Sequence, residues 1–367
     1  MTASSRSRLV RLRALARQIH LWITLIVGLP VAIVSAAGLP ITYWFDTDML
    51  TSRNFFTHQG VGTGRLSLDA LVSSARTASR AARVDSISFS EPGSVAIVSA
   101  PLPGMEEREI ALEPTSGQVV AIRDRHQATV EWLYSLHTRL LLDRIGADLE
   151  GQILIVGLAI CTVILILSGI ILWWPRHFAW SSISPLLRWS RLWSDLHTKA
   201  GLYSLPALTL ASITTVLLTY PATRSTAGRV ISYENSSSAG HATSGPPSLQ
   251  AAAQTAGQVD PNRRFAELAN IDEPSKPYLV GIGDDVRGYR WVDIDRHSGA
   301  LLEVRSEPSR EGDHPAFLIG LHQGHRFGKV GQLLFGISSL VPLLLYTSGL
   351  FIWWQRRQRL RTASRRP

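Results

Sequence analysis

Four histidines stand at the ends of four long apolar segments: His20, His137, His197 and His322. An imidazole in or beside hydrocarbon costs free energy unless it is ligated or hydrogen-bonded, so each of these residues is a candidate for function. Successive crossings of a membrane place His20 and His197 (the first pair) near one face, and His137 and His322 (the second pair) near the other. Low-spin haem iron takes one imidazole on each axial face. The histidines therefore predict two bis-histidine, b-type haems and a route for electrons across a bilayer.

Other interpretations of these histidines exist. A single histidine near a helix end is more often an interfacial residue that hydrogen-bonds to headgroups or carbonyls. Zinc or copper is a weaker alternative, because two imidazoles fall short of the usual three or four ligands. His325 lies three residues past His322 and could replace it as a ligand or contact a substrate, but Leu140 holds the matching place after His137. The comparison of the two repeats therefore favours His322 over His325 as the ligand.

The elements that must position the histidines are membrane-spanning helices. The stretches 18–45, 151–175, 200–223 and 330–355 contain no Asp, Glu, Lys or Arg. Each exceeds the roughly 20 residues that a helix needs to cross the hydrocarbon core. Because backbone polar groups in lipid must be satisfied internally, we expect four transmembrane helices.

The distribution of charge predicts the orientation of these helices. Segments 1–17, 175–199 and 355–367 together carry 15 basic residues and one acidic residue, whereas the rest of the chain carries 22 basic and 27 acidic residues. Basic residues concentrate in cytoplasmic loops, so both termini are expected in the cytoplasm. The high pI then reflects membrane topology, and no basic and aromatic motif indicates a nucleic-acid partner.

Two classes of chemistry lack support in the sequence. The chain has one cysteine, Cys161, which excludes an intrachain disulfide and a cysteine-ligated cluster. No Gly-x-Ser-x-Gly motif indicates a hydrolase.

The segments between the predicted helices are long enough to form small domains. Residues 46–136 and 224–316 each combine an Ala-rich helical stretch (66–83 and 247–257) with short runs of β type. Each ends on a polar turn that contains Ser-Gly, followed by a further strand. The stretch 236–247 is rich in Ser, Gly and Pro and predicts a loop.

The chain also contains an internal repeat. The pattern Gly-Gln-x-Leu, then Ser-Gly-x-x-x-Trp-Trp-x-Arg, occurs at 151–176 and again at 331–356, and each copy follows a Leu-His pair. The first and third apolar segments match more weakly. The sequence thus predicts two copies of a unit made of a helix, an α+β domain and a helix.

These motifs resemble the PepSY-associated transmembrane family over about residues 10–357. Members are bacterial inner-membrane proteins, often iron-regulated, and some reduce ferric siderophores in the periplasm. The resemblance implies two periplasmic PepSY-like domains and a ferric-siderophore substrate. One departure is the spacing of 15 residues from His137 to Gln152, against 10 from His322 to Gln332, which could displace His137.

The predicted fold is therefore a membrane α-helical protein, internally duplicated, with four transmembrane helices and two periplasmic α+β domains. Its expected function is to pass electrons from the cytoplasmic side through the two haems to a ferric siderophore. No flavin or nicotinamide motif is visible, so the donor would be a separate cytoplasmic reductant or a quinol. The alternative is a non-redox sensor, assembly factor or peptidase regulator.

The expected segments are a cytoplasmic N-terminus (1–17), helix one (18–45), periplasmic domain one (46–136), an interfacial helix with helix two (137–175), a cytoplasmic loop (176–196), helix three (197–223), periplasmic domain two (224–316), helix four (317–355) and a cytoplasmic tail (356–367).

Overall fold

The structure is a computed structural model that forms two compact units. The membrane unit comprises Met1–Tyr43, Leu133–Ser225 and Phe317–Pro367, and the sheet unit comprises Trp44–Trp132 and Thr226–Ala316. The residues that the structure describes are 3–56, 64–80, 83–90, 95–102, 105–174, 184, 187–219, 247–284, 288–305 and 314–363. Most of the predicted cytoplasmic loop, Arg176 of the first Trp-Trp motif and the stretch 236–246 lie outside these residues.

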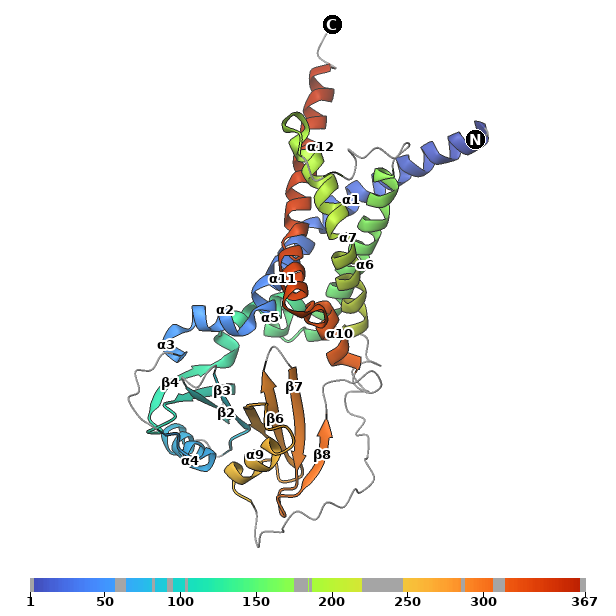
Figure 1. Cartoon of the computed structure of the whole chain (residues 1–367). Coiled ribbons are helices and arrows are strands. Elements are labelled where there is room, and N and C mark those ends of the chain that lie inside the picture. Colours follow the sequence, from blue (N-terminus) through green and yellow to red (C-terminus); the bar gives the residue numbers. More distant parts are fainter. Residues whose placement is uncertain are drawn as a thin grey trace. The chain divides into compact units, whose positions relative to one another are not determined.

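Four long helices form the membrane unit: α1 (Ala3–Thr42), α6 (Asp148–Trp173), α7 (Leu192–Thr219) and α12 (Val341–Ala363). Each shares most of its length with one of four segments that are long and apolar enough to cross a membrane: Val10–Thr42, Asp148–Trp173, Trp189–Thr219 and His325–Thr362. Helix α1 packs against α6 and α12, and α7 packs against the same two helices. The start of α1 and the end of α12 lie at the same end of this bundle (Figure 1). Among the described residues, three shorter helices also contribute to this unit: α5 (Thr129–Arg139), α10 (His314–His322) and α11 (Gly328–Ser338).

The last apolar stretch, expected as one helix, is two helices in the structure. Helix α11 ends at Ser338 and α12 begins at Val341, with Pro342 in the first turn of α12. Proline has no N–H group to donate and its ring clashes with the carbonyl four residues earlier, so it costs least in the first turn of a helix, although α1 and α7 contain Pro30, Pro40 and Pro206 in their interiors. The break between Ser338 and Val341 could not be predicted from hydropathy, because the sequence stays apolar on both sides of it.

The turns that lead into α6 and α11 bring the backbone very close to each helix. Gly151 and Gly331 occupy equivalent places, and a Cβ atom there would collide with the backbone oxygens of Arg139 and Gly324. The turn before α6 is the longer of the two and contains a 3-10 helix, η3 (Leu142–Ile145). The turn before α11 also contains a 3-10 helix, η7 (His325–Phe327). The additional length is therefore accommodated between His137 and α6.

The sheet unit contains one eight-stranded antiparallel sheet with the order β4-β3-β2-β1-β5-β6-β7-β8. The pairing of β1 with β5 joins the strands of the two halves of the chain, and places Ile87 opposite Leu268. The strands are β1 (Ser86–Phe89), β2 (Ala96–Leu102), β3 (Met105–Leu112), β4 (Val119–Asp124), β5 (Phe265–Ala269), β6 (Tyr278–Asp284), β7 (Gly288–Ile294) and β8 (Leu301–Arg305).

A row of buried aliphatic side chains crosses this sheet from strand to strand. Directly opposed residues on β3, β2, β1, β5, β6 and β7 are all fully buried, and they are Ile110, Val98, Ile87, Leu268, Val280 and Val292. They share one core with side chains of α4 (Leu68–Ser79) and α9 (Leu249–Gly257). Alternation along each strand places this apolar row on one face of the sheet, where the two helices cover it.

Side chains in the first turns of α4 and α9 accept hydrogen bonds from backbone N–H groups at the N-terminus of the other helix. Asp69 accepts hydrogen bonds from the backbone N–H groups of Leu249 (2.9 Å) and Gln250 (3.1 Å), and the Gln250 side chain accepts one from Leu68 N–H (3.2 Å). First-turn N–H groups have no partner within their own helix, so these side chains satisfy donors that would otherwise be left open. The two halves of the sheet unit are thereby tied together at the helix level as well as through β1 and β5.

The opposite face of the first half of the sheet is covered by α2 (Trp44–Thr51) and α3 (Arg53–Phe56), which the sequence did not lead us to expect. Phe55 and Phe56 pack with Val95 and Ala111. Arg123 of β4 binds both carboxylate oxygens of the buried Asp48 at 2.7 and 2.6 Å. This bidentate contact fixes α2 against the edge of the sheet.

Glu113 organises the turn before β4. Its carboxylate accepts hydrogen bonds from the backbone N–H groups of Thr115 (3.2 Å) and Ser116 (2.5 Å), and Asp295 binds His297 and Ser298 in the same way in the second half. Hydrogen bonds from Ser116 and then Thr115 lower the pKa of Glu113 from 4.5 to about 2. Because the folded-state pKa is depressed, this group stabilises the fold fully above pH 4.5, and the contribution is lost as the pH falls toward 2.

We expect Glu113→Gln to lower the free energy of unfolding at pH 7 by about 1–2 kcal/mol, since hydrogen bonds to a charged acceptor are replaced by weaker ones. Thermal unfolding of the full chain in detergent measures this loss. The difference from wild type should shrink as the pH is lowered from 4.5. Glu150→Gln, at an exposed carboxylate, is the matched control. An unchanged midpoint for Glu113→Gln at pH 7 would show that the turn does not depend on this charge.

Candidate functional site

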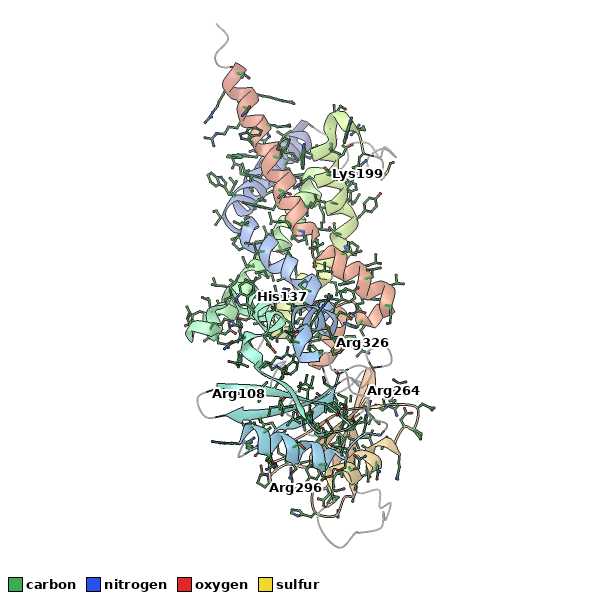
Figure 2. The ribbon with its side chains drawn as sticks, turned by 90° about the vertical axis from the view of Figure 1, so that its left-hand side faces the viewer. Arg108, His137, Lys199, Arg264, Arg296 and Arg326 are labelled. Carbon is green, nitrogen blue, oxygen red and sulfur yellow. The ribbon has the colours of Figure 1, made fainter. Side chains whose placement is uncertain are left out.

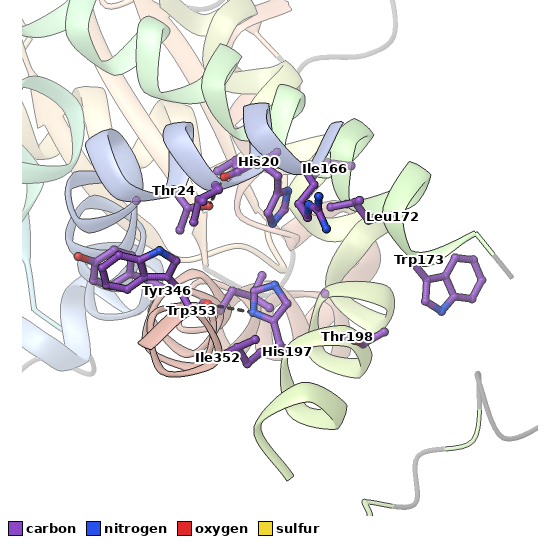
Figure 3. A pocket seen from close by; sticks show the side chains of 18 of the residues that line it. His20, Thr24, Ile166, Leu172, Trp173, His197, Thr198, Tyr346, Ile352 and Trp353 are labelled. Carbon is purple, nitrogen blue, oxygen red and sulfur yellow. Dashed lines mark hydrogen bonds between the residues drawn. The ribbon is translucent and has the colours of Figure 1, made fainter. Parts of the chain in front are cut away.

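The first pair of histidines faces across the bundle. His20 extends from α1 and His197 from α7, and their ring centres are 6.2 Å apart with an angle of 77° between the ring planes. Figure 3 shows the two rings pointing toward each other across a cavity. This cavity has a volume of about 760 Å³ and is lined mainly by apolar side chains of α1, α6, α7 and α12.

The second pair repeats this geometry further along the bundle. His137 of α5 and His322 of α10 have ring centres 6.1 Å apart and an interplanar angle of 64°. His137 Nδ1 lies 2.8 Å from the carbonyl oxygen of Val34. Val34 follows His20 by 14 residues on α1, which corresponds to a rise of about 21 Å. Figure 2 shows His137 and Lys199, which is two residues from His197, toward opposite ends of the bundle.

In the first pair, serines fix the orientation of the imidazoles. His20 Nδ1 lies 2.9 Å from Ser168 Oγ, and His197 Nδ1 lies 3.1 Å from both Ser348 Oγ and the carbonyl oxygen of Leu345. Each serine hydroxyl donates its own proton to a backbone carbonyl of its helix. The carbonyl of Leu345 can only accept, so His197 Nδ1 carries a proton and its lone pair remains on Nε2, and the same tautomer of His20 would donate to Ser168.

The second pair reaches the same protonation through other partners. His137 Nδ1 can only donate to the carbonyl of Val34. His322 Nδ1 lies 2.9 Å from Thr214 Oγ1, whose proton goes to the carbonyl of Leu210 at 2.8 Å. A neutral His137 ring thus has its lone pair on Nε2, and the same tautomer of His322 would donate to Thr214. A second partner that fixes tautomer and ring direction is characteristic of histidines that ligate metals.

Three of the rings lie against glycines, and the approach is tightest at Gly349. A Cβ atom at Gly169 would lie 3.6 Å from His20 Cε1, at Gly349 it would lie 3.1 Å from His197 Cε1, and at Gly38 it would lie 3.4 Å from His137 Cε1. In the first pair, this explains the repeated Ser-Gly motif in chemical terms. The serine contacts Nδ1, and at Gly349 the absence of a Cβ atom lets the His197 ring approach the helix closely.

The pairs suit an ion with two opposed imidazole ligands. Metal–imidazole bonds of about 2.0–2.1 Å, with each ring centre about 1.1 Å behind its nitrogen, separate the ring centres by about 6.3 Å. The observed 6.2 and 6.1 Å match this value. Within the residues that the structure describes, no three or more His, Cys, Asp or Glu side chains form a group that could hold a metal ion. Two axial nitrogens and a broad apolar cavity fit a haem better than they fit tetrahedral zinc.

All four histidines singled out in the sequence lie in these two pairs, with the partners that were expected. His325 is exposed at the start of η7, and it is His322 whose ring faces His137. The hydrogen-bond partners of the rings were not identified from the sequence. Ser168 and Ser348 belong to the repeated motif, which was available as a signal but was used only to align the two halves.

The fold and the site define a class: a four-helix membrane protein with two layers of facing histidines and a β-sheet unit. The chain belongs to the family described as the PepSY-associated TM region, which matches residues 17–356. The resemblance noted in the sequence is thereby confirmed. A search of curated proteins finds no match.

Proposed function

We propose that this protein is a dihaem electron-transfer protein of the bacterial inner membrane that reduces ferric siderophores in the periplasm. In this proposal both termini lie in the cytoplasm and the sheet unit lies in the periplasm, in agreement with the concentration of basic residues in segments 1–17, 175–199 and 355–367. The chain is an internal duplication, and each haem lies between its two halves.

The observation that carries the proposal is the pairing of imidazole rings at two depths of one helix bundle, with ring centres 6.2 and 6.1 Å apart. Four half-buried imidazoles, each hydrogen-bonded through Nδ1, are costly in an apolar bundle unless the remaining nitrogen has a ligand. A haem held by two imidazoles supplies one-electron transfer and leaves no open position for dioxygen.

The residues of the chain have three tasks in this function. Ser168, Ser348 and Thr214 hold the imidazoles in the tautomer that presents Nε2. The apolar lining of the cavity excludes water from the first site. The helices fix the two layers about 21 Å apart along α1, so that charge can cross most of the hydrocarbon between two fixed points.

A haem held by these imidazoles would supply one electron for the reduction of Fe(III) to Fe(II) in the chelate, and the protein would form no bond to the substrate. Hard oxygen chelators hold Fe(III) tightly and Fe(II) much more weakly, so the reduction releases the metal. The electron donor is a quinol or a cytoplasmic reductant.

Rapid mixing tests this function. Purified protein reduced with dithionite, freed of excess reductant and mixed with a ferric hydroxamate chelate, should reoxidise with the appearance of Fe(II) trapped by a ferrous-specific dye. We expect one Fe(II) for each haem oxidised. Reduced protein that stays reduced in the presence of ferric chelates would contradict the assignment of substrate.

The serines provide a test of how the first site is held. Ser348→Ala removes one acceptor of His197 Nδ1–H, and loss of such a partner weakens metal binding by about 10–100-fold. We expect faster haem loss from the first site to apomyoglobin, while the second site is unaffected. Thr347→Ala is the matched control, because Thr347 is adjacent and exposed. Equal rates of haem loss in the two variants would show that the serine does not support the ligand.

A further inference from the structure

Three arginines line the mouth of the cavity at the first pair: Arg17, Arg356 and Arg357. Arg17 precedes His20 by three residues on α1, a rise of about 4.5 Å. Arg356 and Arg357 follow Gly349, which packs against His197, by seven and eight residues on α12. Residues at these spacings share a helix face, so the guanidinium groups stand on the same side as the imidazoles and toward the chain termini.

These arginines place positive charge beside an apolar cavity without matching negative charge. Among the described residues, no carboxylate lies within ion-pair distance of any of the three. The acid nearest in sequence to His197, Asp195, is bound to Arg188 at 3.0 Å. Arg357 lies 5.3 Å from the ring centre of Trp353, which also lines the cavity.

Membrane topology accounts for basic residues near the termini but not for their position at this cavity. Arg8, Arg11, Arg359 and Arg361 are also basic residues near the ends of the chain, and none of them lines it. An apolar cavity with guanidinium groups at one edge fits an amphipathic ligand with an acidic end. Arginine is well suited to such a ligand, because its planar donors match a carboxylate in bidentate geometry.

We propose that Arg17, Arg356 and Arg357 bind the two propionate carboxylates of the haem held by His20 and His197. The inference rests on the proposed function and extends it, because it fixes which edge of the macrocycle faces the cytoplasm. The arginines are positioning residues: they neutralise the acidic edge of the ligand while the imidazoles hold its centre.

Haem and its dimethyl ester, which lacks the carboxylate charges, separate this role from a general effect on the fold. The experiment uses the full chain carrying His322→Ala, so that only the first site fills, and titrates apo-protein with each ligand. We expect this protein to bind haem at least about tenfold more tightly than the diester, as for a charge-assisted hydrogen bond. In Arg17→Gln and in the double variant Arg356→Gln, Arg357→Gln this preference should fall, with diester affinity unchanged.

Arg359→Gln, on the same helix outside the cavity, is the matched control and should keep the full preference. Arginine variants that still prefer haem as strongly as the control would overturn the inference and leave the proposed function standing. A chain with native histidines that binds neither ligand would overturn both. Reduced affinity for both ligands would show a role in folding and would also contradict propionate binding.

Discussion

Replacement of His20 or His197 by alanine is expected to remove one haem from each chain and leave the other. The two rings are 6.2 Å apart and have no neighbouring histidine to substitute for either of them among the described residues. An iron with one axial imidazole loses its low-spin spectrum and is held much more weakly. His137→Ala and His322→Ala should remove the second haem in the same way, and the double variant His20→Ala, His322→Ala should be colourless.

Haem content per chain and the reduced optical spectrum in detergent measure these losses. His325→Ala is the control, because His325 is exposed and lies next to the second pair in sequence without facing His137. Two haems should remain in that variant. If His325→Ala lost a haem and His322→Ala kept both, the ligand would be His325, and the pairing seen in the structure would not describe the haem-bound protein.

The second large effect is expected on electron transfer across the membrane. In vesicles that contain the protein, an internal reductant should reduce an external, impermeant ferric chelate. Loss of either haem should lower the rate to that of protein-free vesicles, because the two layers are about 21 Å apart along α1 and each spans only part of the hydrocarbon. The variant His20→Ala tests the first pair of histidines, and His322→Ala tests the second pair.

The same vesicles with His325→Ala should retain the wild-type rate. Reduction of the chelate by detergent-solubilised protein gives a further control, because the His20→Ala variant is expected to keep the second haem and to react there with a soluble reductant. Undiminished transfer across vesicles by either single-haem variant would show that electrons do not pass through both sites in series.

Much of this architecture was accessible from the sequence because its signals are local. Four uncharged stretches, two sets of β-type runs and one repeated helix motif predicted the helices and strands close to where they lie. The pairing of His20 with His197 and of His137 with His322 follows from chain direction alone. None of these inferences needs a contact between distant residues.

The remaining features depend on such contacts. His20 and Ser168 are 148 residues apart, and nothing in either segment states that they meet. The antiparallel pairing of β1 with β5, which makes one sheet from two sets of strands, is likewise non-local. The extra residues before α6 raised a doubt about His137 that sequence could not resolve, because the answer lies in the turn geometry at η3 and Gly151.

The central claim is that each pair of imidazoles holds one iron. Protein purified from cells grown with sufficient iron and haem precursor, and measured by haem assay and electron paramagnetic resonance, tests it most directly. We predict two haems per chain, both low-spin with two imidazole ligands. A folded protein without haem would contradict the account and favour a non-redox role for this chain.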